Sequence, residues 1–482
     1  MAGGAFKTDG FISSDIAAWA AGLAPGHLSD AAVESAKLFL FDALGCALGG
    51  SGQEDVLRAL ELAEKLGGDP SPRPSPGGRG GQRCTAFVSG LATDPIQAAF
   101  LNSLMIRAMD YNDIYWKQDP SHPSDLIPAA MSICQMNGLG GRDLLLGICI
   151  AYELEMRLCE AGIPGVREYG WHHATLTAFA SPVVAGRMLG LSADEIQHAI
   201  GISASHSASL GAVTAGKLTN MKNTVDPMAV RSGVEAALLA QLGYTGPEHI
   251  FDGKEGLFHV FGHEWDEAKL VKGLPTCPRC EWKILQCGMK SFPIEALSHA
   301  PLTAMMQCAK ENNIKADDVA EIKVEVIARA ADILGDPSKY RPTSKETADH
   351  SLPYSLAVGL VDGMVTPKQF KQLRIDDPTL VPIMDKVKVV ANDEFEKLFP
   401  EFQPSRVTIT LNDGASFATR VDVPKGDPRD PMTEEEIAVK FKALGEEVIG
   451  AETCEKIRAC VMGIDTADSL DELFVLMTGG RE

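Results

Sequence analysis

The sequence predicts a mostly α fold, built from a large all-helical domain and a smaller α+β lid domain. Helix start and stop signals recur through the first 272 residues, whereas the alternating apolar and polar residues typical of strands begin only after that point. The chain has 482 residues, which exceeds the length at which one hydrophobic core usually stops growing. We therefore expect a helical domain over residues 1–272, completed by residues 426–482, and a lid domain over residues 273–425.

Local signals place the ends of several helices in the helical domain. Ser and Asp favour the position before a helix because their side chains accept hydrogen bonds from its first free N–H groups, and Pro favours the first turn. Glycine favours the position after the last turn. On these grounds we expect helices from Ser29 to Gly49-Gly50, from Pro95 to Met109, from the capping box of Ser192 and Glu195, and from Asp226-Pro227 to Gly243.

Small residues crowd the middle of the helical domain, and short side chains let helix axes approach closely. We therefore expect a central buried helix that contains Ala174, Ala178, Ala180, Ala185 and Gly186. Residues 67–82, GGDPSPRPSPGGRGGQ, are too poor in apolar side chains to fold alone, so we expect a surface loop there.

Strand patterns define the lid domain. Ile322, Val324 and Val326 alternate with charged residues, and Asn412-Asp413-Gly414 separates two further alternating runs, at residues 407–411 and 417–423, which predicts a β-hairpin. We expect helices to begin near Thr347, Pro367 and Pro378, and a capping box of Thr433 and Glu436 to open a helical tail that packs back on the helical domain.

Composition and charge limit the kinds of partner. The chain is 45% hydrophobic and 23% charged, which is typical of a globular protein, and it has no apolar run long enough to cross a bilayer. The first ten residues lack the features of a secretory or mitochondrial leader, so we expect a cytoplasmic protein. A net charge of −21 argues against nucleic acid or an anionic membrane as partner, and any anionic substrate must meet a local cationic pocket.

The eleven cysteines are dispersed and are expected to be reduced and mostly buried. The exception is Cys277-Pro-Arg-Cys280, with Cys287 just beyond it. A single CxxC pair is a weak signal for a metal or an iron–sulfur cluster. It leaves open an iron–sulfur hydratase, an alternative that a colourless, chelator-insensitive protein would exclude.

The segment from Asp110 to Asp125 is the richest in reactive side chains. It places Asp110, Asp113 and His122 between one predicted helix end and the next helix start. From this segment alone, a polar turn whose Asp and Ser side chains cap the neighbouring helices is as well supported as a functional site. His122, flanked by Ser121 and Pro123, is nevertheless presented where a general acid or base is useful.

Histidines and lysines elsewhere supply further candidates. His172 and His173 precede the small-residue helix, and the positive end of that helix favours a neutral imidazole. Adjacent histidines should point in different directions, so we expect at most one of them to face a site. Lys222 lies immediately before a predicted helix, which suits a carboxylate site, although a solvated surface lysine is the commoner case. Lys290 lies near the predicted domain junction, where ligand pockets often form. His350 precedes a predicted helix, and a buried polar helix start is as plausible there as a binding site.

Taken together, these motifs resemble the MmgE/PrpD family, which includes 2-methylcitrate dehydratase, cis-aconitate decarboxylase and iminodisuccinate epimerase. Each motif is weak alone, but together they occur in the family's order and cover nearly the whole chain. The matching pieces are FDALGCALGG at 41–50, RAMDYND at 107–113, HPSD at 122–125, GWH at 170–172, MK at 221–222, KSFP at 290–293 and ETADHSLP at 346–353.

The resemblance implies the fold expected above, a homodimer and an active site between the domains. It places Asp110, His122, His172, Lys222 and Lys290 around the substrate, with His350 and Asp113 as further substrate ligands, and it implies no metal or organic cofactor. Two departures from the family pattern stand out. Ile114 replaces a common threonine, and Asp226-Pro227 stands where relatives commonly have glycine.

The expected reaction is the removal of water from 2-methylcitrate or a citrate-like tricarboxylate to give the corresponding aconitate, without a metal ion. Lys222 and Lys290 would hold carboxylates and stabilise developing negative charge. His122 would transfer a proton, Asp110 would orient a histidine or hydroxyl, and His172 would be a second proton carrier or carboxylate ligand. Decarboxylation of cis-aconitate and epimerisation need the same groups and stay open, as does a non-catalytic helical scaffold.

Overall fold

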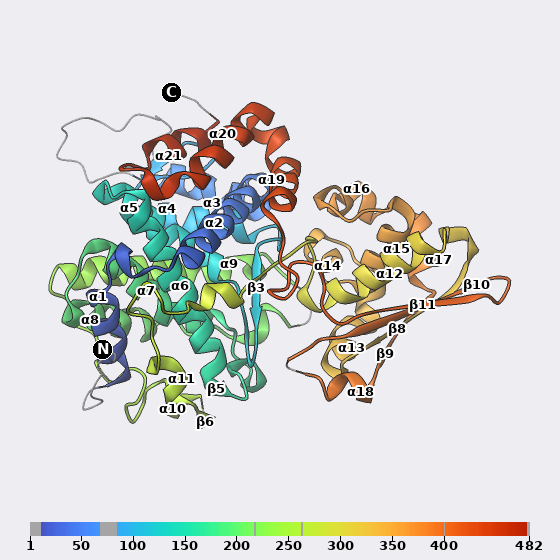
Figure 1. The fold of residues 1–482 in the computed structure, drawn as a ribbon, viewed down its shortest axis with the longest axis horizontal. Helices are drawn as coiled ribbons and strands as arrows, with labels where there is room; N and C mark the ends of the chain where they lie inside the picture. The colour runs from blue at the N-terminus through green and yellow to red at the C-terminus, as the bar shows by residue number, and fades with distance from the viewer. Residues whose placement is uncertain (1–10, 68–83, 216–217, 262–263, 400, 480–482) are drawn as a thin grey trace. The chain divides into compact units, whose positions relative to one another are not determined.

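The computed structural model describes residues 11–67, 84–215, 218–261, 264–399 and 401–479. The chain forms two compact units, drawn in Figure 1. The first comprises Met1–Gly216, Asn220–Cys287 and Thr433–Glu482, and the second comprises Lys217–Thr219 and Gly288–Met432. The sequence predicts boundaries at residues 272/273 and 425/426, whereas the two units meet along the chain near 287/288 and 432/433.

The first unit is a helical assembly, and the prediction of a mostly α fold is confirmed. Small antiparallel pairs of strands interrupt it, so it is not purely helical as expected: β1 (Cys84–Thr85) with β2 (Ala92–Thr93), β3 (Asp113–Trp116) with β4 (Pro120–Ser121), and β5 (Gly162–Ile163) with β6 (Glu264–Trp265). Its helices are α1 (Ile12–Gly22), α2 (Asp30–Gly50), α3 (Glu54–Lys65), α4 (Pro95–Arg107), α5 (Ile127–Asn137), α6 (Gly141–Ala161), α7 (Ala174–Leu189), α8 (Ala193–Ala204), α9 (Met221–Gln241), α10 (Leu257–Val260), α11 (Glu267–Val271), α19 (Glu434–Ile449), α20 (Ala451–Met462) and α21 (Asp471–Met477).

The predicted helix starts at Ser29, Asp94, Ser192 and Thr433 are confirmed. The Ser29 hydroxyl accepts the N–H of Ala32 at 3.2 Å before α2, and the Asp94 carboxylate accepts the N–H of Gln97 at 2.9 Å before α4. Capping boxes open α8 and α19 as expected.

Helix α9 begins earlier than predicted. It starts at Met221, so Asp226 and Pro227 lie inside the helix, and Lys222 lies in its first turn instead of before it. A proline in a helix interior removes one backbone hydrogen bond and usually breaks the helix. Here the surrounding segment, including Lys222, Asn223 and Asp226, is buried, so tertiary packing overrides the local preference.

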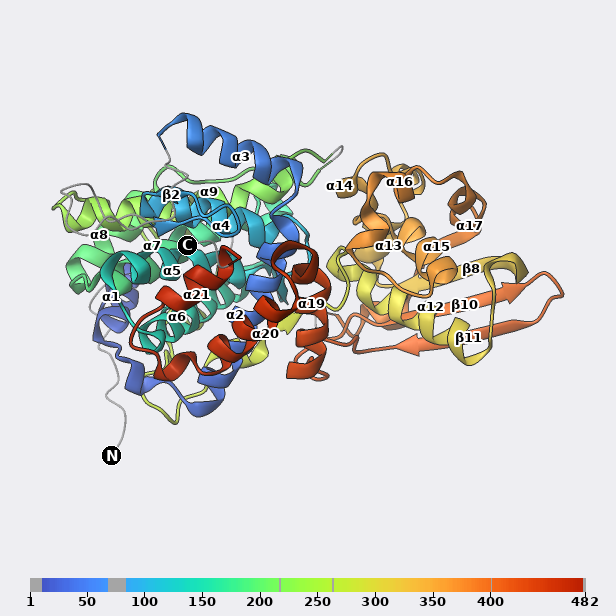
Figure 2. The same ribbon diagram turned by 90° about the horizontal axis from the view of Figure 1, so that it is seen from above.

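Helix α7 is the buried centre of the first unit, as the small residues predict, and α9 packs closely along it (Figure 2). A Cβ atom added at Gly233 of α9 would lie 2.1 Å from the Oγ of Ser181 on α7. The absence of a side chain at Gly233 is therefore what permits this close approach.

The C-terminal helices belong to the first unit. The Phe441 ring of α19 stacks on Phe41 of α2 with centroids 4.3 Å apart. The Lys440 ammonium lies 2.6 Å from the Asp42 carboxylate, and both residues are buried. The two ends of the chain thus form one hydrophobic core.

The second unit contains a four-stranded sheet in the order β11-β10-β8-β9. In this sheet β8 and β9 are parallel and the other pairs are antiparallel, and the predicted β10–β11 hairpin turns at Gly414, whose φ is 91°. The strands are β8 (Val319–Val326), β9 (Val387–Ala391), β10 (Ser405–Leu411) and β11 (Ser416–Val421), and β7 (Gly288–Met289) opens the unit. The helices are α12 (His299–Glu311), α13 (Ala328–Leu334), α14 (Lys345–Ala348), α15 (Leu352–Asp362), α16 (Gln372–Ile375), α17 (Val381–Met384) and α18 (Asp393–Glu396).

Three predicted helix starts in this unit are only partly right. The signal near Thr347 marks a single helical turn, and the longer helix begins at Leu352. Pro367 and Pro378 each open a short 3₁₀ turn, because proline sets the first helical φ angle without ensuring propagation.

Two sequence-based expectations, the surface loop at 67–82 and the character of the first ten residues, lie almost wholly outside the described residues. Among the described helices, none combines the length and apolar character required to cross a membrane.

Candidate functional site

The segment from Asp110 to His122 is a small β-hairpin and not an open loop. Helix α4 ends at Arg107, and Asp110 adopts a left-handed conformation with φ of 50°, which aspartate tolerates better than most residues. Strands β3 and β4 then pair Tyr115 with Ser121. His122 follows directly and is fixed between this hairpin and the next helical turn.

The His122 ring is held in one tautomer. Its Nδ1 lies 2.6 Å from the carbonyl oxygen of Asp113. A carbonyl can only accept a hydrogen bond, so Nδ1 carries the proton and Nε2 of the neutral ring keeps its lone pair. The side chain is 6% exposed. His122 is therefore arranged to accept a proton at Nε2.

The Asp113 side chain supports this arrangement from behind. Its carboxylate accepts hydrogen bonds from the Ser124 hydroxyl at 2.6 Å and from the Ser124 N–H at 3.0 Å. Burial raises the pKa of Asp113 to about 6, although the bonds from Ser124 act in the opposite direction. These contacts fix the turn on both sides of His122, and a role for Asp113 in substrate binding stays a prediction.

The His172 ring holds the opposite tautomer. The backbone N–H of Ala174, in the first turn of α7, donates to Nδ1 of His172 at 3.2 Å, so the proton of the neutral ring lies on Nε2. Burial, followed by the neighbouring His173, lowers the pKa of His172 well below its usual range, which agrees with the expected neutral imidazole. Among the described residues, Nε2 has no hydrogen-bond partner.

His172 and His173 do not point apart, so that expectation is wrong. Their ring centroids are 4.0 Å apart with planes tilted by 35°, and both side chains are buried. The rule for neighbouring helical residues does not apply because His172 precedes the helix, where Trp171 bridges to Leu210, and His173 is the N-terminal cap of α7.

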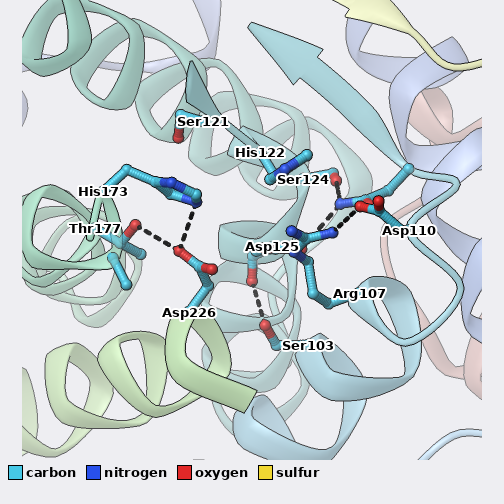
Figure 3. A network of polar contacts seen from close by, with 12 residues as sticks. Ser103, Arg107, Asp110, Ser121, His122, Ser124, Asp125, His173, Thr177 and Asp226 are labelled. Carbon is cyan, nitrogen blue, oxygen red and sulfur yellow. Dashed lines mark hydrogen bonds and ion pairs between the residues drawn. The ribbon is translucent and has the colours of Figure 1, made fainter. Parts of the chain in front are cut away.

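Asp226 on α9 contacts the second histidine, as Figure 3 shows. The His173 Nε2 lies 3.3 Å from Asp226 Oδ1, and the hydroxyl of Thr177 lies 3.5 Å from the same oxygen. Burial alone would raise the pKa of Asp226. The contacts with His173 and the nearby charge of Arg107 outweigh burial and bring this pKa below its usual range. The His122 and His173 centroids are 5.8 Å apart, so three histidines gather here.

Lys222 and Arg107 supply buried positive charge. The Nζ of Lys222 lies 3.4 Å from Asp110 and the residue is 1% exposed, which excludes a solvated surface lysine. Arg107 forms an ion pair with Asp110 and lies 3.6 Å from Asp125 (Figure 3). Since a buried charge is tolerated only with a partner, Asp110 holds both cations in place.

A further buried acid, Glu155 on α6, was missed by the sequence reasoning. It accepts hydrogen bonds from the hydroxyls of Ser121 at 2.6 Å and Thr177 at 2.8 Å. Burial raises its pKa to about 8, so the side chain is a neutral acid at physiological pH. The available signal was two glutamates, Glu153 and Glu155, directly after the apolar stretch 144–152 of the same helix. Arg107, Asp125, His173 and Asp226 were likewise not predicted as site residues.

Lys290 and His350 belong to the second unit. Lys290 is 2% exposed. His350 Nδ1 lies 2.5 Å from the Asp349 carboxylate, whose other oxygen is 2.9 Å from the Lys345 ammonium. The predicted residues of the first unit, by contrast, lie on connected elements: Lys222 contacts Asp110, Asp113 holds His122, and His173 lies within ring contact of both His122 and His172.

The cysteines do not support an iron–sulfur site. Cys277 and Cys280 flank one turn, whereas the Cys287 thiol lies 3.5 Å from the carbonyl oxygen of Ile114. Within the described part of the chain, no cysteine joins a group of three or more side chains whose ligand atoms lie within 4.8 Å of one another.

His172, His173 and Asp226 do form such a group, with ligand atoms within 4.8 Å. Two imidazoles and a carboxylate are suitable ligands for zinc. The hydrogen bond at Nδ1, however, leaves the proton of a neutral His172 on Nε2, and a protonated nitrogen has no lone pair for a metal. The geometry therefore favours hydrogen bonding over metal binding at this group.

The described structure combines a helical assembly, an α+β unit and, in the first unit, a buried cluster of histidines, carboxylates and cations. The chain belongs to the MmgE/PrpD family. The family's N-terminal domain matches residues 14–268, and its C-terminal domain matches residues 292–466.

Relatives with named activities are similar over most of their length. A cis-aconitate decarboxylase-like protein, oryM, of Aspergillus oryzae is 25% identical over 98% of this chain and 98% of its own. The Homo sapiens cis-aconitate decarboxylase is 25% identical over 95% of this chain and 92% of its own. The 2-methylcitrate dehydratase of Salmonella typhi is 25% identical over 83% of both chains.

Proposed function

We propose that the protein is a hydro-lyase that removes water from 2-methylcitrate, or from a citrate-like tricarboxylate, to give the corresponding aconitate. The observation that carries the proposal is the opposite character of the backbone groups at the two Nδ1 atoms: a carbonyl oxygen faces Nδ1 of His122, and an N–H faces Nδ1 of His172. His122 offers a lone pair at Nε2, and His172 offers a proton at Nε2. An elimination of water needs both, since a base must take the C–H proton while a donor serves the departing hydroxyl.

Lys222 is suited to the charge that develops during this step. A C–H next to a carboxylate is a very weak acid, and its loss places negative charge on that carboxylate. Lys222 lies in the first turn of α9, where the free N–H groups and the helix dipole add to the charge of the ammonium. Donors that are in place before the reaction usually make the largest contribution to catalysis.

The roles of the remaining predicted residues follow from their contacts. Asp110 contacts Lys222 and Arg107, so we assign it to holding the cations in place instead of orienting a histidine. We propose that Lys290 and His350 of the second unit are additional carboxylate ligands. An ammonium group and an imidazole both donate hydrogen bonds to carboxylates, and Lys290 is buried. No step of the proposed elimination requires a metal ion.

Decarboxylation of cis-aconitate is the second candidate. It is favoured by the match to relatives of that name, which covers 95–98% of this chain, whereas the match to the named 2-methylcitrate dehydratases covers 80–83%. It would use the same cations to hold carboxylates, and the Nε2 proton of His172 to protonate carbon.

Incubation with 2-methylcitrate, citrate and cis-aconitate in separate reactions distinguishes these functions. The proposal predicts a rise in alkene absorbance with 2-methylcitrate or citrate and no release of carbon dioxide. If carbon dioxide is released from cis-aconitate and neither 2-methylcitrate nor citrate reacts, the protein is a decarboxylase and the proposed dehydration is wrong. If no tricarboxylate reacts or raises the melting temperature, the site does not bind this class of compound and a scaffold becomes the better account.

A cytoplasmic location and a homodimer stay predictions. One relative, from Yarrowia lipolytica, is named as a mitochondrial 2-methylcitrate dehydratase, so a mitochondrial location is the alternative outcome. Cell fractionation tests the first prediction, and light scattering on the purified chain tests the second.

A further inference from the structure

We propose that His173 and Asp226 form a charged pair that positions His172, keeping the His172 ring neutral with its proton on Nε2. The pair lies deep in the first unit, with His173 4% and Asp226 2% exposed. Neither residue needs to touch the substrate, so both are positioning residues. The kinetic part of this inference rests on the proposed function, whereas the protonation of the rings does not.

The geometry fixes the pair from two helices. His173 is the cap of α7, and Asp226 lies on the second turn of α9, which the close approach at Gly233 and Ser181 brings against α7. The distance of 3.3 Å between Nε2 of His173 and Oδ1 of Asp226 is that of an ion pair. A carboxylate so close and so buried is a strong acceptor for an N–H at Nε2 of His173 and stabilises positive charge on that ring.

The position of His173 explains how the pair acts on His172. The two ring centroids are 4.0 Å apart, so a proton on His173 opposes a second proton on His172. The Ala174 N–H occupies Nδ1 of His172 and leaves its single proton on Nε2. A neutral imidazole that donates a hydrogen bond from Nε2 can polarise a substrate oxygen without carrying charge itself.

The charged groups around the pair are compatible with this assignment. Asp119 lies close enough for His173 to lower its pKa, although burial dominates and raises it. Burial and His173 lower the pKa of His172 most, Asp226 raises it by less than His173 lowers it, and Arg167 and Arg107 lower it further. Arg107 is already paired with Asp110 and near Asp125. Of the remaining groups near the pair, Glu155 accepts the Thr177 hydroxyl, and the third ring is that of His122.

The test is Asp226→Asn, which removes the charge and keeps the size of the side chain. Histidine ¹⁵N NMR of the full chain reports the protonation of each ring without substrate, with assignments from His172→Gln and His173→Gln. We expect the wild type to show a charged His173 and a neutral His172 protonated at Nε2 at pH 7. In Asp226→Asn, His173 should become neutral at that pH.

The kinetic expectation is a fall of about 10-fold or more in kcat with less than about a 3-fold change in KM, and a shift of the acid limb of the kcat profile to higher pH. Asp226→Glu, which retains the carboxylate, should restore part of the loss. The matched control is Asp252→Asn at the exposed His249–Asp252 pair, whose atoms are 3.4 Å apart, and it should change neither kcat nor the pH profile.

Unchanged ring protonation in Asp226→Asn would overturn the inference, even if activity falls. A Zn²⁺ titration of the wild type gives an independent outcome: a rise in melting temperature lost in Asp226→Asn would make the group a metal site and would also overturn it. If the NMR result is as expected but no tricarboxylate reacts, the charged pair stands and the proposed function fails.

Discussion

At the scale of single residues, backbone groups decide how the two candidate proton carriers are protonated. A carbonyl oxygen faces Nδ1 of His122, and an N–H faces Nδ1 of His172. A carbonyl oxygen can only accept a hydrogen bond and an N–H can only donate one, so the two neutral rings carry their protons on different nitrogens. This difference is the basis on which we propose His122 as the base and His172 as the proton donor.

Replacement of His122 by alanine should lower kcat by roughly 10²–10⁴-fold, the usual contribution of a general acid or base. The melting temperature is measured alongside, because the loss of this buried ring also removes its hydrogen bond to the Asp113 carbonyl and should lower stability. The measurement is steady-state turnover of 2-methylcitrate. His259→Ala, at an exposed position on α10, is the control and should retain full activity. Near-normal turnover in His122→Ala would remove this residue from the mechanism.

Glu155 should make the protein less stable as the pH rises. Its pKa in the folded state is about 8, above the ordinary value of 4.5, so the folded state binds this proton more tightly than the unfolded state. Stability is then greatest below about pH 4.5 and is lost as the pH rises through 8, by as much as roughly 5 kcal/mol.

The measurement is the difference in melting temperature between pH 6 and pH 9. Glu155→Gln mimics the protonated acid and should lose less stability over this interval than the wild type. Glu235→Gln, at an exposed position on α9, should behave like the wild type. Equal losses in wild type and Glu155→Gln would show that Glu155 titrates normally.

At the scale of helices, the contact of α7 with α9 sets the distance between His173 and Asp226. Gly233→Ala would place a Cβ atom 2.5 Å from the Cβ of Ser181 and 2.7 Å from the backbone nitrogen of Pro182. Backbone atoms cannot move aside locally, so the helices must separate. We expect a loss of about 1–3 kcal/mol in unfolding free energy, together with reduced kcat.

Denaturant unfolding measures this loss. Gly22→Ala, at the end of α1, meets no atom within 4 Å and should leave stability unchanged or slightly higher. A stable and fully active Gly233→Ala variant would mean that α7 and α9 tolerate a larger separation than the site geometry implies.

At the scale of the whole molecule, the first unit is closed by residues from both ends of the chain. Phe441 is 2% exposed and stacks on Phe41. Phe441→Ala should therefore cost about 3–5 kcal/mol in unfolding free energy. Val439→Ala on the same helix is the control, because Val439 is 72% exposed, and should cost little. A small effect of Phe441→Ala would show that α19 contributes little to the core.

The sequence by itself determined the class of fold, most of the capped helix starts, the hairpin predicted from residues 407–411 and 417–423, and most of the candidate residues. These features depend on neighbours within a few positions, such as Ser29 with the first turn of α2, or on motifs whose order is preserved along the chain. The family's two domains match both parts of the chain and agree with that interpretation.

Only the tertiary structure decided which side chains meet. Asp226 and Pro227 are typical of a helix start, yet they lie inside α9, because the packing of buried residues around them outweighs a local proline signal. His173 was expected to turn away from its neighbour, yet its ring lies beside that of His172. The same ring contacts Asp226, which is 53 residues further along the chain. Contacts between distant segments depend on how two helices pack, and no local pattern encodes that distance.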